Sequence, residues 1–218
     1  PVARALLSVS DKTGLVDLGR GLAALEVELV ASGGTATALR EAGLTVLDVA
    51  DLTQSPEMLG GRVKTLHPKV HGGILARRDL AADREDLEAN AIGTIDLVVV
   101  NLYPFEETVA KPGVEYAEAI EKIDIGGPSM VRSAAKNHEY VAVLSNPADY
   151  DAVLAELRDS GGISRATRRR LALQAFRSTA SYDAAIQQWL GEQLAEEDGE
   201  IFPPALIAGL PKVTDLRY

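Results

Sequence analysis

The run Asp96-Leu97-Val98-Val99-Val100 decides the fold that this sequence predicts. Its apolar residues are continuous instead of alternating with polar ones, which is typical of a strand covered on both faces, as in a parallel sheet. Similar β-rich runs recur along the chain. The candidate strands are residues 5–9, 27–31, 45–49, 97–102 and 141–145.

Stretches with helical character separate these runs. The candidate helices are residues 15–25, 36–42, 83–91, 114–122 and 148–158. Strands that alternate with helices favour an α/β fold, with a mostly parallel sheet of about five strands flanked by helices on both sides.

From Ser164 the pattern changes to a long helical segment that Ser164 can N-cap. An apolar stripe on this segment predicts packing within the core or between domains rather than a binding site. The stripe consists of Phe176, Tyr182, Ile186, Trp189 and Leu190. After Gly199, proline breaks favour an extended linker or arm. We therefore expect one domain with C-terminal helices, residues 1–198, and a linker, residues 199–218.

The composition is that of a globular protein with a large core, since 46% of the 218 residues are hydrophobic. The chain has no cysteine, which excludes disulfides, thiolate nucleophiles and cysteine-based zinc sites. No apolar run approaches the roughly 20 residues that span a bilayer. No basic-then-apolar leader opens the sequence. We therefore expect a cytoplasmic enzyme.

The formal net charge of −10 argues against broad nucleic-acid binding, which needs a basic face. A phosphorylated small molecule needs only a local cluster of cations. Lys12, Arg62, Lys64 and Lys136 could supply one.

Three loops are expected at the carboxyl ends of strands, where a parallel sheet places its ligand, and the third of them carries Arg62, Lys64 and Thr65. In Ser8-Val9-Ser10-Asp11-Lys12-Thr13-Gly14, the hydroxyls and the ammonium could hold a phosphate, or Ser10 or Asp11 could cap the next helix. In Ala31-Ser32-Gly33-Gly34-Thr35-Ala36-Thr37, the glycines let the backbone approach an oxyanion and the helix N-terminus adds positive charge. The alternative for this loop is a tight turn with Thr35 as N-cap.

The run Gly60-Gly61-Arg62-Val63-Lys64-Thr65-Leu66-His67-Pro68 puts a guanidinium, an ammonium and a hydroxyl on a flexible loop. It predicts an anion-binding, proton-moving site, and the alternative is a solvated basic loop. His67 and His71 are four residues apart, but we expect Pro68 to prevent a helix there. The zinc-protease motif is absent, and His67 is expected to shape the loop.

Two later segments add polar groups. Asn101 can read a carboxamide and Tyr103 offers a phenol. In Asp124-Ile125-Gly126-Gly127-Pro128-Ser129, a carboxylate precedes glycines whose N–H groups could stabilise an oxyanion, and Pro128 suits a first helical position. By helical spacing Ser129, Arg132, Ser133 and Lys136 share one face. Lys136 is expected to face the same cleft, or else to be an ordinary surface lysine.

Six motifs, in this order, resemble the N-terminal inosine monophosphate (IMP) cyclohydrolase domains of bifunctional purine biosynthesis proteins. They are Ser-Val-Ser-Asp-Lys-Thr-Gly (8–14), Ala-Ser-Gly-Gly-Thr-Ala (31–36), Gly-Gly-Arg-Val-Lys-Thr-Leu-His-Pro (60–68), Asn-Leu-Tyr-Pro-Phe (101–105), Ile-Asp-Ile-Gly-Gly (123–127) and Arg-Ser-Ala-Ala-Lys-Asn-His (132–138). The resemblance covers roughly residues 3 to 195 and implies a methylglyoxal-synthase-like fold. It also implies ring closure of 5-formamidoimidazole-4-carboxamide ribonucleotide (FAICAR) to IMP, the final step of de novo purine biosynthesis, without metal or other cofactor.

The resemblance implies the site residues as well. The implied catalytic residues are Lys64, Tyr103, Asp124 and Lys136. The implied substrate-binding residues are Ser10, Lys12, Ser32, Gly33, Gly34, Thr35, Arg62, Thr65, Asn101, Ile125, Gly126 and Gly127. We expect Asp124 and Lys136 to engage the carboxamide, Lys64 with the Gly126 and Gly127 amides to receive the formyl oxygen, and Tyr103 to assist proton transfer.

In the family a larger formyltransferase domain follows, and the full-length protein is a homodimer. Because Tyr218 is the last residue, the chain is expected to be the isolated first domain with its linker. The nucleotides FAICAR and IMP are the expected partners, with no nucleic acid and no membrane. The main alternative is a non-catalytic nucleotide- or phosphate-binding regulatory module of the same fold. A methylglyoxal synthase and a purely structural role rank lower.

Overall fold

The computed structural model describes residues 1–198, and the predicted linker 199–218 lies outside the described residues. The chain divides into two compact units. Unit 1 consists of Pro1–Tyr103 and Asp124–Arg177, and unit 2 consists of Pro104–Ile123 and residues 178–198. All the loops singled out above as candidate sites begin or lie in unit 1.

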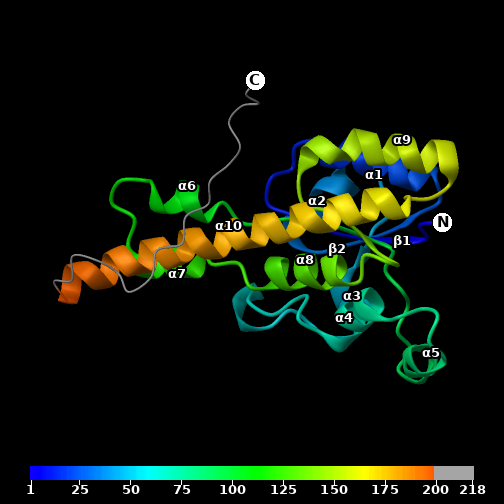
Figure 1. The fold of residues 1–218 in the computed structure, drawn as a ribbon, viewed down its shortest axis with the longest axis horizontal. Helices are drawn as coiled ribbons and strands as arrows, with labels where there is room; N and C mark the ends of the chain where they lie inside the picture. Colours follow the sequence, from blue (N-terminus) through cyan, green and yellow to red (C-terminus); the bar gives the residue numbers. More distant parts are fainter. Residues whose placement is uncertain (199–218) are drawn as a thin grey trace, which may run out of the picture. The chain divides into compact units, whose positions relative to one another are not determined.

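A five-stranded sheet in the order β3-β2-β1-β4-β5 forms the centre of unit 1, and every neighbouring pair is parallel. Two of its strands, β1 and β2, are labelled in Figure 1. The strands are β1 (Arg4–Val9), β2 (Glu28–Ala31), β3 (Leu47–Asp48), β4 (Leu97–Asn101) and β5 (Ala142–Leu144). The predicted α/β fold and its five strands are thus confirmed. β3 is shorter than predicted because Val49 begins a helix instead of continuing the strand.

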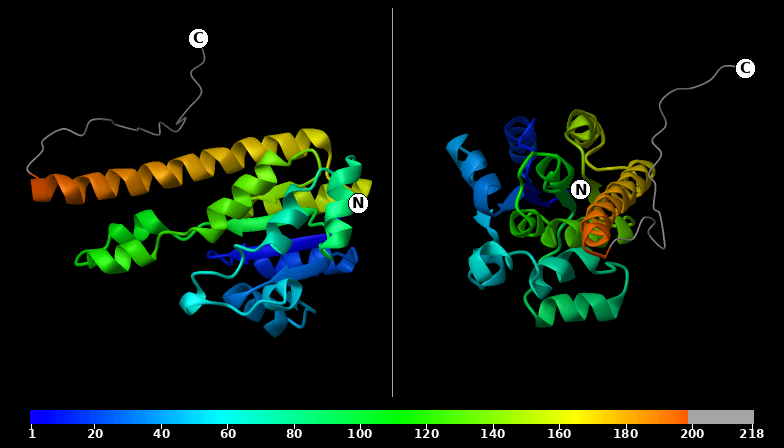
Figure 2. Two further views of the ribbon diagram at one scale, coloured as in Figure 1. Left: turned by 90° about the horizontal axis from the view of Figure 1, so that it is seen from below. Right: turned by 90° about the vertical axis from the view of Figure 1, so that its left-hand side faces the viewer.

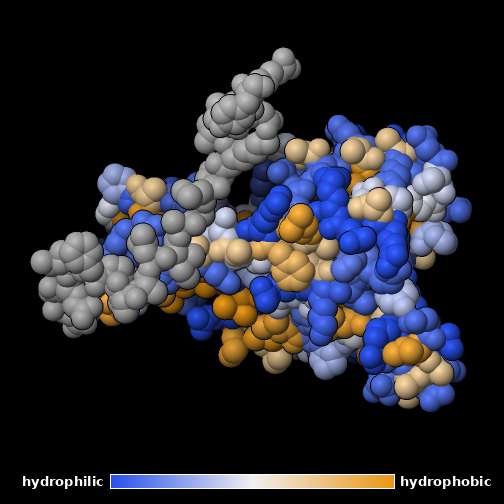
Figure 3. All heavy atoms as spheres, viewed as in Figure 1, coloured by the Kyte–Doolittle hydropathy of each residue, from blue (hydrophilic) through white to orange (hydrophobic). Residues whose placement is uncertain are grey.

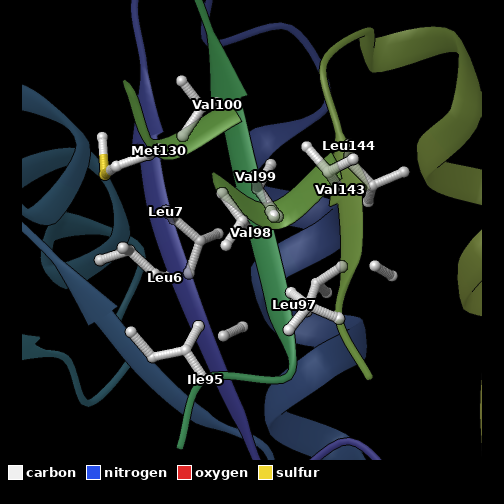
Figure 4. Close-up of a cluster of buried hydrophobic side chains, with 14 of the residues drawn as sticks. Leu6, Leu7, Ile95, Leu97, Val98, Val99, Val100, Met130, Val143 and Leu144 are labelled. Atoms are coloured by element: carbon white, nitrogen blue, oxygen red, sulfur yellow. The ribbon is translucent and has the colours of Figure 1, made fainter. Parts of the chain in front are cut away.

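The run that predicted the fold is the centre of the core. β1 and β4 pair directly, and Leu6, Leu7, Val98 and Val99 are completely buried between helices on the two faces (Figure 4). Burial on both faces accounts for the unbroken apolar character of β4.

Helices cover both faces of this sheet. The helices of unit 1 are α1 (Leu15–Ala24), α2 (Gly33–Glu41), α3 (Val49–Thr53), η1 (Leu59–Gly61), α4 (Pro68–Leu75), α5 (Ala81–Ala89), α8 (Gly126–Lys136), η2 (Pro147–Asp149) and α9 (Tyr150–Ser160). α1 packs with α2 and α9 on one face, and α8 packs with α4 on the other (Figure 2). The chain runs outward from β1 to β3 and then returns to β4 and β5, so right-handed crossovers place the two sets on opposite faces. The strand order therefore reverses between β1 and β4.

α4 contradicts the prediction that Pro68 prevents a helix. Pro68 is the first residue of α4, where the N–H that proline lacks would have no helical partner. His67 is the N-cap, and its Nδ1 accepts the N–H of Lys69 at 3.1 Å, so this histidine shapes the loop as expected. The position predicted for Pro128 is also wrong, because Pro128 is the third residue of α8.

α10 (Arg165–Asp198) begins in unit 1 and continues into unit 2. The predicted cap is confirmed, since Ser164 Oγ accepts the N–H of Thr167 at 3.2 Å. None of the helices among residues 1–198 is long and apolar enough to span a membrane. The short helix α5 buries none of its residues, and its surface at the lower right of Figure 3 is mostly hydrophilic.

Unit 2 contains α6 (Phe105–Val109), α7 (Tyr116–Glu121) and the second part of α10. Aromatic rings pack together within this unit. The Trp189 ring contacts Phe105 edge to face, with 5.6 Å between the ring centroids, and stacks on Tyr116, with 5.4 Å between the centroids. Tyr182 contacts Phe105 at 6.3 Å. The packing role predicted for the stripe on the long helix is confirmed at Tyr182 and Trp189.

Candidate active site

The first predicted loop is held at the point where the strand order reverses. Asn101 ends β4, and its Oδ1 accepts the N–H groups of Ser10 and Asp11 at 2.6 and 2.9 Å. Its Nδ2 donates to the carbonyl of Asp11 at 2.8 Å. The Asn101 side chain therefore fixes the loop between β1 and α1. The N-cap of α1 is Gly14, so neither Ser10 nor Asp11 caps this helix.

Tyr150 supports the same loop, and no pattern in the sequence pointed to it. Its phenol hydrogen-bonds to the Asn101 side chain, and burial raises the pKa of Tyr150 to about 12. Its ring lies against Gly14, where an added Cβ would be 3.3 Å from Tyr150 Cδ2. Tyr150 opens a helix far along the chain from Asn101, so only the fold brings these two side chains together.

The second loop forms the N-terminus of α2. Ser32 is the N-cap, but its hydroxyl makes no capping hydrogen bond. Thr35 lies inside the helix and is buried, which rules out its alternative role as N-cap. Its Oγ1 accepts the N–H of Val9 at 3.0 Å and donates to the Val9 carbonyl at 3.2 Å. Thr35 thus fastens α2 to the end of β1.

Two ammonium groups converge on this helix N-terminus. Lys64 Nζ is 3.5 Å from the position that a Cβ on Gly33 would occupy, and Lys12 Nζ is 3.6 Å from the corresponding position on Gly34. The partial positive charge of the helix end adds to the two cations. Together with the Ser32 hydroxyl, they form a set of donors suited to a phosphate.

The N-terminus of α8 carries the predicted carboxylate. Asp124 Oδ1 accepts the N–H of Gly127 at 2.8 Å, and the N–H of Tyr103 also donates to this carboxylate. Burial raises the pKa of Asp124 above its ordinary value, although these two hydrogen bonds oppose the shift. Asp124 is therefore a half-buried carboxylate at the start of a helix.

Lys64 and Thr65 connect the two helix ends. Thr65 Oγ1 lies 2.8 Å from the position of a Cβ on Gly126, the first residue of α8. Among the described residues none hydrogen-bonds to this hydroxyl. Consecutive residues are 3.8 Å apart at Cα, so the dipeptide places an ammonium at the α2 N-terminus and a hydroxyl at the α8 N-terminus.

The remaining predicted residues lie at different distances from this centre. Tyr103 lies next to Asp124 in space and Ile125 follows it in sequence, and the two residues are 50% and 60% exposed. Arg62 is exposed, two residues before Lys64. Lys136 is exposed at the last position of α8. The helix rise separates its Cα from that of Gly126 by about 15 Å along the axis. The structure thus brings the predicted loops together but leaves Lys136 apart from Asp124.

The face predicted on α8 is divided among several partners. Ser129 Oγ donates to the carbonyl of Gly126 at 2.8 Å, Ser133 Oγ lies 3.1 Å from His71 Nδ1, and the Arg132 guanidinium lies over the ring of Phe176. Within residues 1–198, no group of three or more His, Asp or Glu side chains is placed to hold a metal ion.

Comparisons with known proteins agree with this fold. Residues 14–129 match the family described as MGS-like domain, and residues 134–218 match the AICARFT/IMPCHase bienzyme family. The crystal structure of ForH is 42% identical in sequence, with a TM-score of 0.77, and the match covers 86% of this chain and 98% of that chain.

The chain also matches curated bifunctional purine biosynthesis proteins PurH. It is 60% identical over 197 residues to the protein of Dinoroseobacter shibae, a match that covers 90% of this chain and 37% of the relative. The identity to the protein of Desulfitobacterium hafniense is 56% over 219 residues, covering 99% of this chain and 42% of the relative. The chain therefore spans about two fifths of the length of these relatives.

Proposed function

We propose that this chain, which belongs to the family of MGS-like domains, is an IMP cyclohydrolase that converts FAICAR to IMP. The family that matches residues 134–218 is named for IMPCHase, and the relatives are named as purine biosynthesis proteins. In this reaction the carboxamide nitrogen of FAICAR bonds to the formyl carbon of the same molecule. The formyl oxygen leaves as water with one hydrogen from each of the two nitrogens.

The observation that carries the proposal is the connection of two helix N-termini by Lys64 and Thr65. A nucleotide has a dianionic phosphate at one end and a reacting base at the other. A cationic α2 N-terminus suits the phosphate, and an α8 N-terminus with a carboxylate suits groups that exchange protons. Since one dipeptide joins them, the two ends lie close enough for a single nucleotide.

At the phosphate end we assign Lys12, Ser32 and the amides of Gly33 and Gly34 to the phosphate oxygens. Charge-assisted hydrogen bonds to an anion are stronger than neutral ones. Ser10, Arg62 and the loop that Asn101 fixes complete this end of the site. Thr35 acts here through the position of α2 rather than by contact, because its hydroxyl is engaged with Val9.

At the reacting end the protein must activate a poor nucleophile. We assign Asp124 to the carboxamide nitrogen, from which it accepts a proton as the new bond forms. A carboxylate whose pKa is raised is a stronger base than an ordinary one. The Thr65 hydroxyl and the Gly126 amide receive the formyl oxygen, and Tyr103 passes a proton to it. The role of Lys64 at the formyl oxygen stays a prediction from the family resemblance, because its ammonium lies at the α2 N-terminus, where it suits the phosphate.

Orientation supplies much of the rate in this scheme. An enforced near-attack geometry contributes roughly 7–11 kcal/mol to lowering a barrier. We assign Ile125 to holding the substrate in that geometry, and the close approach of Gly127 to Asp124 keeps the carboxylate in place. The catalytic role of Lys136 remains a prediction from the family resemblance, since its distance along α8 does not support direct cooperation with Asp124.

We further propose that the protein is cytoplasmic, that its substrates are free nucleotides and that it does not bind nucleic acid. We also propose that it forms a homodimer when a formyltransferase domain follows it in the chain. The support is the match to relatives of greater length. The sedimentation of a chain extended to that length tests the dimer.

The affinity for IMP and the rate of cyclisation, measured on the protein and on Asp124→Asn, test the proposed function. We expect the variant to bind IMP within about threefold of the original affinity, because the carboxamide still accepts the Gly127 N–H, and to lose roughly 100-fold or more in kcat. Binding of IMP without cyclisation by the unmodified protein would favour the regulatory module. Release of methylglyoxal from dihydroxyacetone phosphate would favour a methylglyoxal synthase.

A further inference from the structure

Glu57 lies at the cationic end of the site, although nothing in the sequence pointed to it. Its Oε2 is 2.9 Å from Lys64 Nζ, and the two side chains are 48% and 31% exposed. Both pack against Gly61, where an added Cβ would be 2.6 Å from Glu57 Oε1 and 3.0 Å from Lys64 Cε. The ion pair is therefore held against backbone and is not a loose surface contact.

A small hairpin creates this pair. Met58 and Val63 form an antiparallel bridge, with N–H to carbonyl distances of 3.1 and 3.3 Å. Leu59, Gly60 and Gly61 turn the chain with φ angles of 56°, 63° and 95°. Glu57 and Lys64 are the next residues outward from the bridge, so closing the hairpin puts their side chains opposite each other.

The Glu57 carboxylate offsets the positive charges that surround the Lys64 ammonium. Lys64 Nζ and Lys12 Nζ lie beside Gly33 and Gly34, at a helix end that is itself positive. These like charges repel each other when no anion is bound, and lysine has a flexible stem with several rotatable bonds. Without Glu57, repulsion from Lys12 and from the positive helix end would turn the Lys64 ammonium toward solvent.

We propose that Glu57 is a positioning residue, whose carboxylate holds the Lys64 ammonium at the α2 N-terminus and stands in for the anion of the nucleotide until it binds. This inference rests on the proposed function for its kinetic part only. The same carboxylate that orients Lys64 also competes with the incoming phosphate. Removing its charge therefore has opposite effects on catalysis and on anion affinity.

Glu57→Gln and Glu57→Asp test this directly, with Glu85→Gln as control. Glu85 lies exposed on α5, and its substitution makes the same change in net charge as Glu57→Gln. The measurements are kcat with FAICAR and the dissociation constant of inorganic phosphate by calorimetry. Unfolding midpoints in urea exclude a loss of structure.

For Glu57→Gln we expect kcat to fall roughly tenfold, because a misplaced group costs rate steeply. The dissociation constant of phosphate should fall about two- to fivefold, the range that a partly exposed charge contributes. Glu57→Asp keeps the charge on a shorter stem, so its phosphate affinity should match the original protein while kcat recovers only in part. Glu85→Gln should change neither quantity.

Unchanged kcat and phosphate affinity in Glu57→Gln would overturn the inference, and so would weaker phosphate binding combined with a lower unfolding midpoint. If the unmodified protein cyclises FAICAR and Glu57→Gln behaves identically, the positioning role proposed for Glu57 is wrong and the proposed function stands. If the unmodified protein does not cyclise FAICAR but Glu57→Gln binds phosphate more tightly, the proposed function fails and the anion stand-in is upheld.

Discussion

The carboxylate of Asp124 accepts the N–H of Gly127 at 2.8 Å, so the residue assigned to proton transfer also bonds to the first turn of α8. A helix N-terminus favours a negative charge, whereas burial disfavours it. For Asp124 burial is the larger effect, and its pKa is raised. The fold therefore holds this carboxylate where its charged form is costly, which is the condition expected of a base.

Asp124→Asn should stabilise the protein at neutral pH while removing its activity. The folded-state pKa of Asp124 lies above its ordinary value of 3.8, so the folded state binds more protons than the unfolded state in that interval. The free energy of unfolding of the original protein therefore falls as the pH rises through the raised pKa. Urea unfolding at several pH values should show this fall, and the variant should lack it. A variant that is less stable than the original at pH 7 would contradict this account.

Gly127→Ala should damage the site by steric conflict. An added Cβ would lie 2.3 Å from Asp124 Oδ2 and 3.0 Å from Leu102 Cδ2. We expect a loss of roughly 1–3 kcal/mol in the free energy of unfolding and of about 100-fold in kcat. Gly191→Ala is the matched control, because among the described residues its Cβ would meet only Gln187 Nε2, at 3.8 Å. That substitution should stabilise the helix by up to about 1 kcal/mol, and equal effects of the two would refute the steric argument.

Thr35→Val should destabilise the junction of α2 with β1. The Thr35 hydroxyl pairs with both the N–H and the carbonyl of Val9, and buried polar groups left without partners cost roughly 1–3 kcal/mol. Thr35→Ser keeps the hydroxyl and should lose only about 1 kcal/mol. Thr37→Val, on the exposed side of the same helix, should change the free energy of unfolding by less than about 0.5 kcal/mol. If Thr35→Val and Thr35→Ser are equally stable in urea, the hydroxyl does not fasten α2.

His71 should make the stability depend on pH below neutrality. Its Nδ1 lies 3.1 Å from Ser133 Oγ, its buried Nε2 has no hydrogen-bond partner within residues 1–198, and burial lowers its pKa below the ordinary 6.5. The unfolded state therefore binds more protons than the folded state between the lowered pKa and 6.5. The free energy of unfolding should fall as the pH decreases through this interval.

His71→Gln removes the titrating group and should flatten that part of the curve. His138→Gln is the control, because the His138 ring contacts the carbonyl of Ala135 rather than a buried side chain. The free energy of unfolding in urea, measured between pH 5 and pH 7.5 for both variants and the original protein, distinguishes the two histidines. The account fails if the His71→Gln curve is as steep as the original.

The sequence predicted the parts of this molecule that follow a period or a composition. Continuous apolar runs located all five strands, and the glycines after the second strand located the N-terminus of α2. The position of these loops at the carboxyl ends of parallel strands follows from topology alone. The loops of the candidate site were therefore identifiable before the structure.

The parts that were missed depend on contacts between segments. Pro68 was wrongly expected to prevent a helix, because the same residue breaks a helix interior and suits its first position. The pairing of Glu57 with Lys64 requires a hairpin closed by three consecutive residues with positive φ, and one of them is Leu59. Asn101 was expected to read a carboxamide, a role that remains a prediction, and its bonds to Ser10 and Asp11 arise only when β1 and β4 pair.

The central claim is tested most directly by adding FAICAR to the purified chain, without folate or added metal, and following IMP formation by absorbance. We predict rapid, stoichiometric conversion that Asp124→Asn abolishes and that Glu85→Gln leaves unchanged. No conversion by a protein that still binds IMP would contradict the claim that the two helix ends joined by Lys64 and Thr65 form a cyclising site.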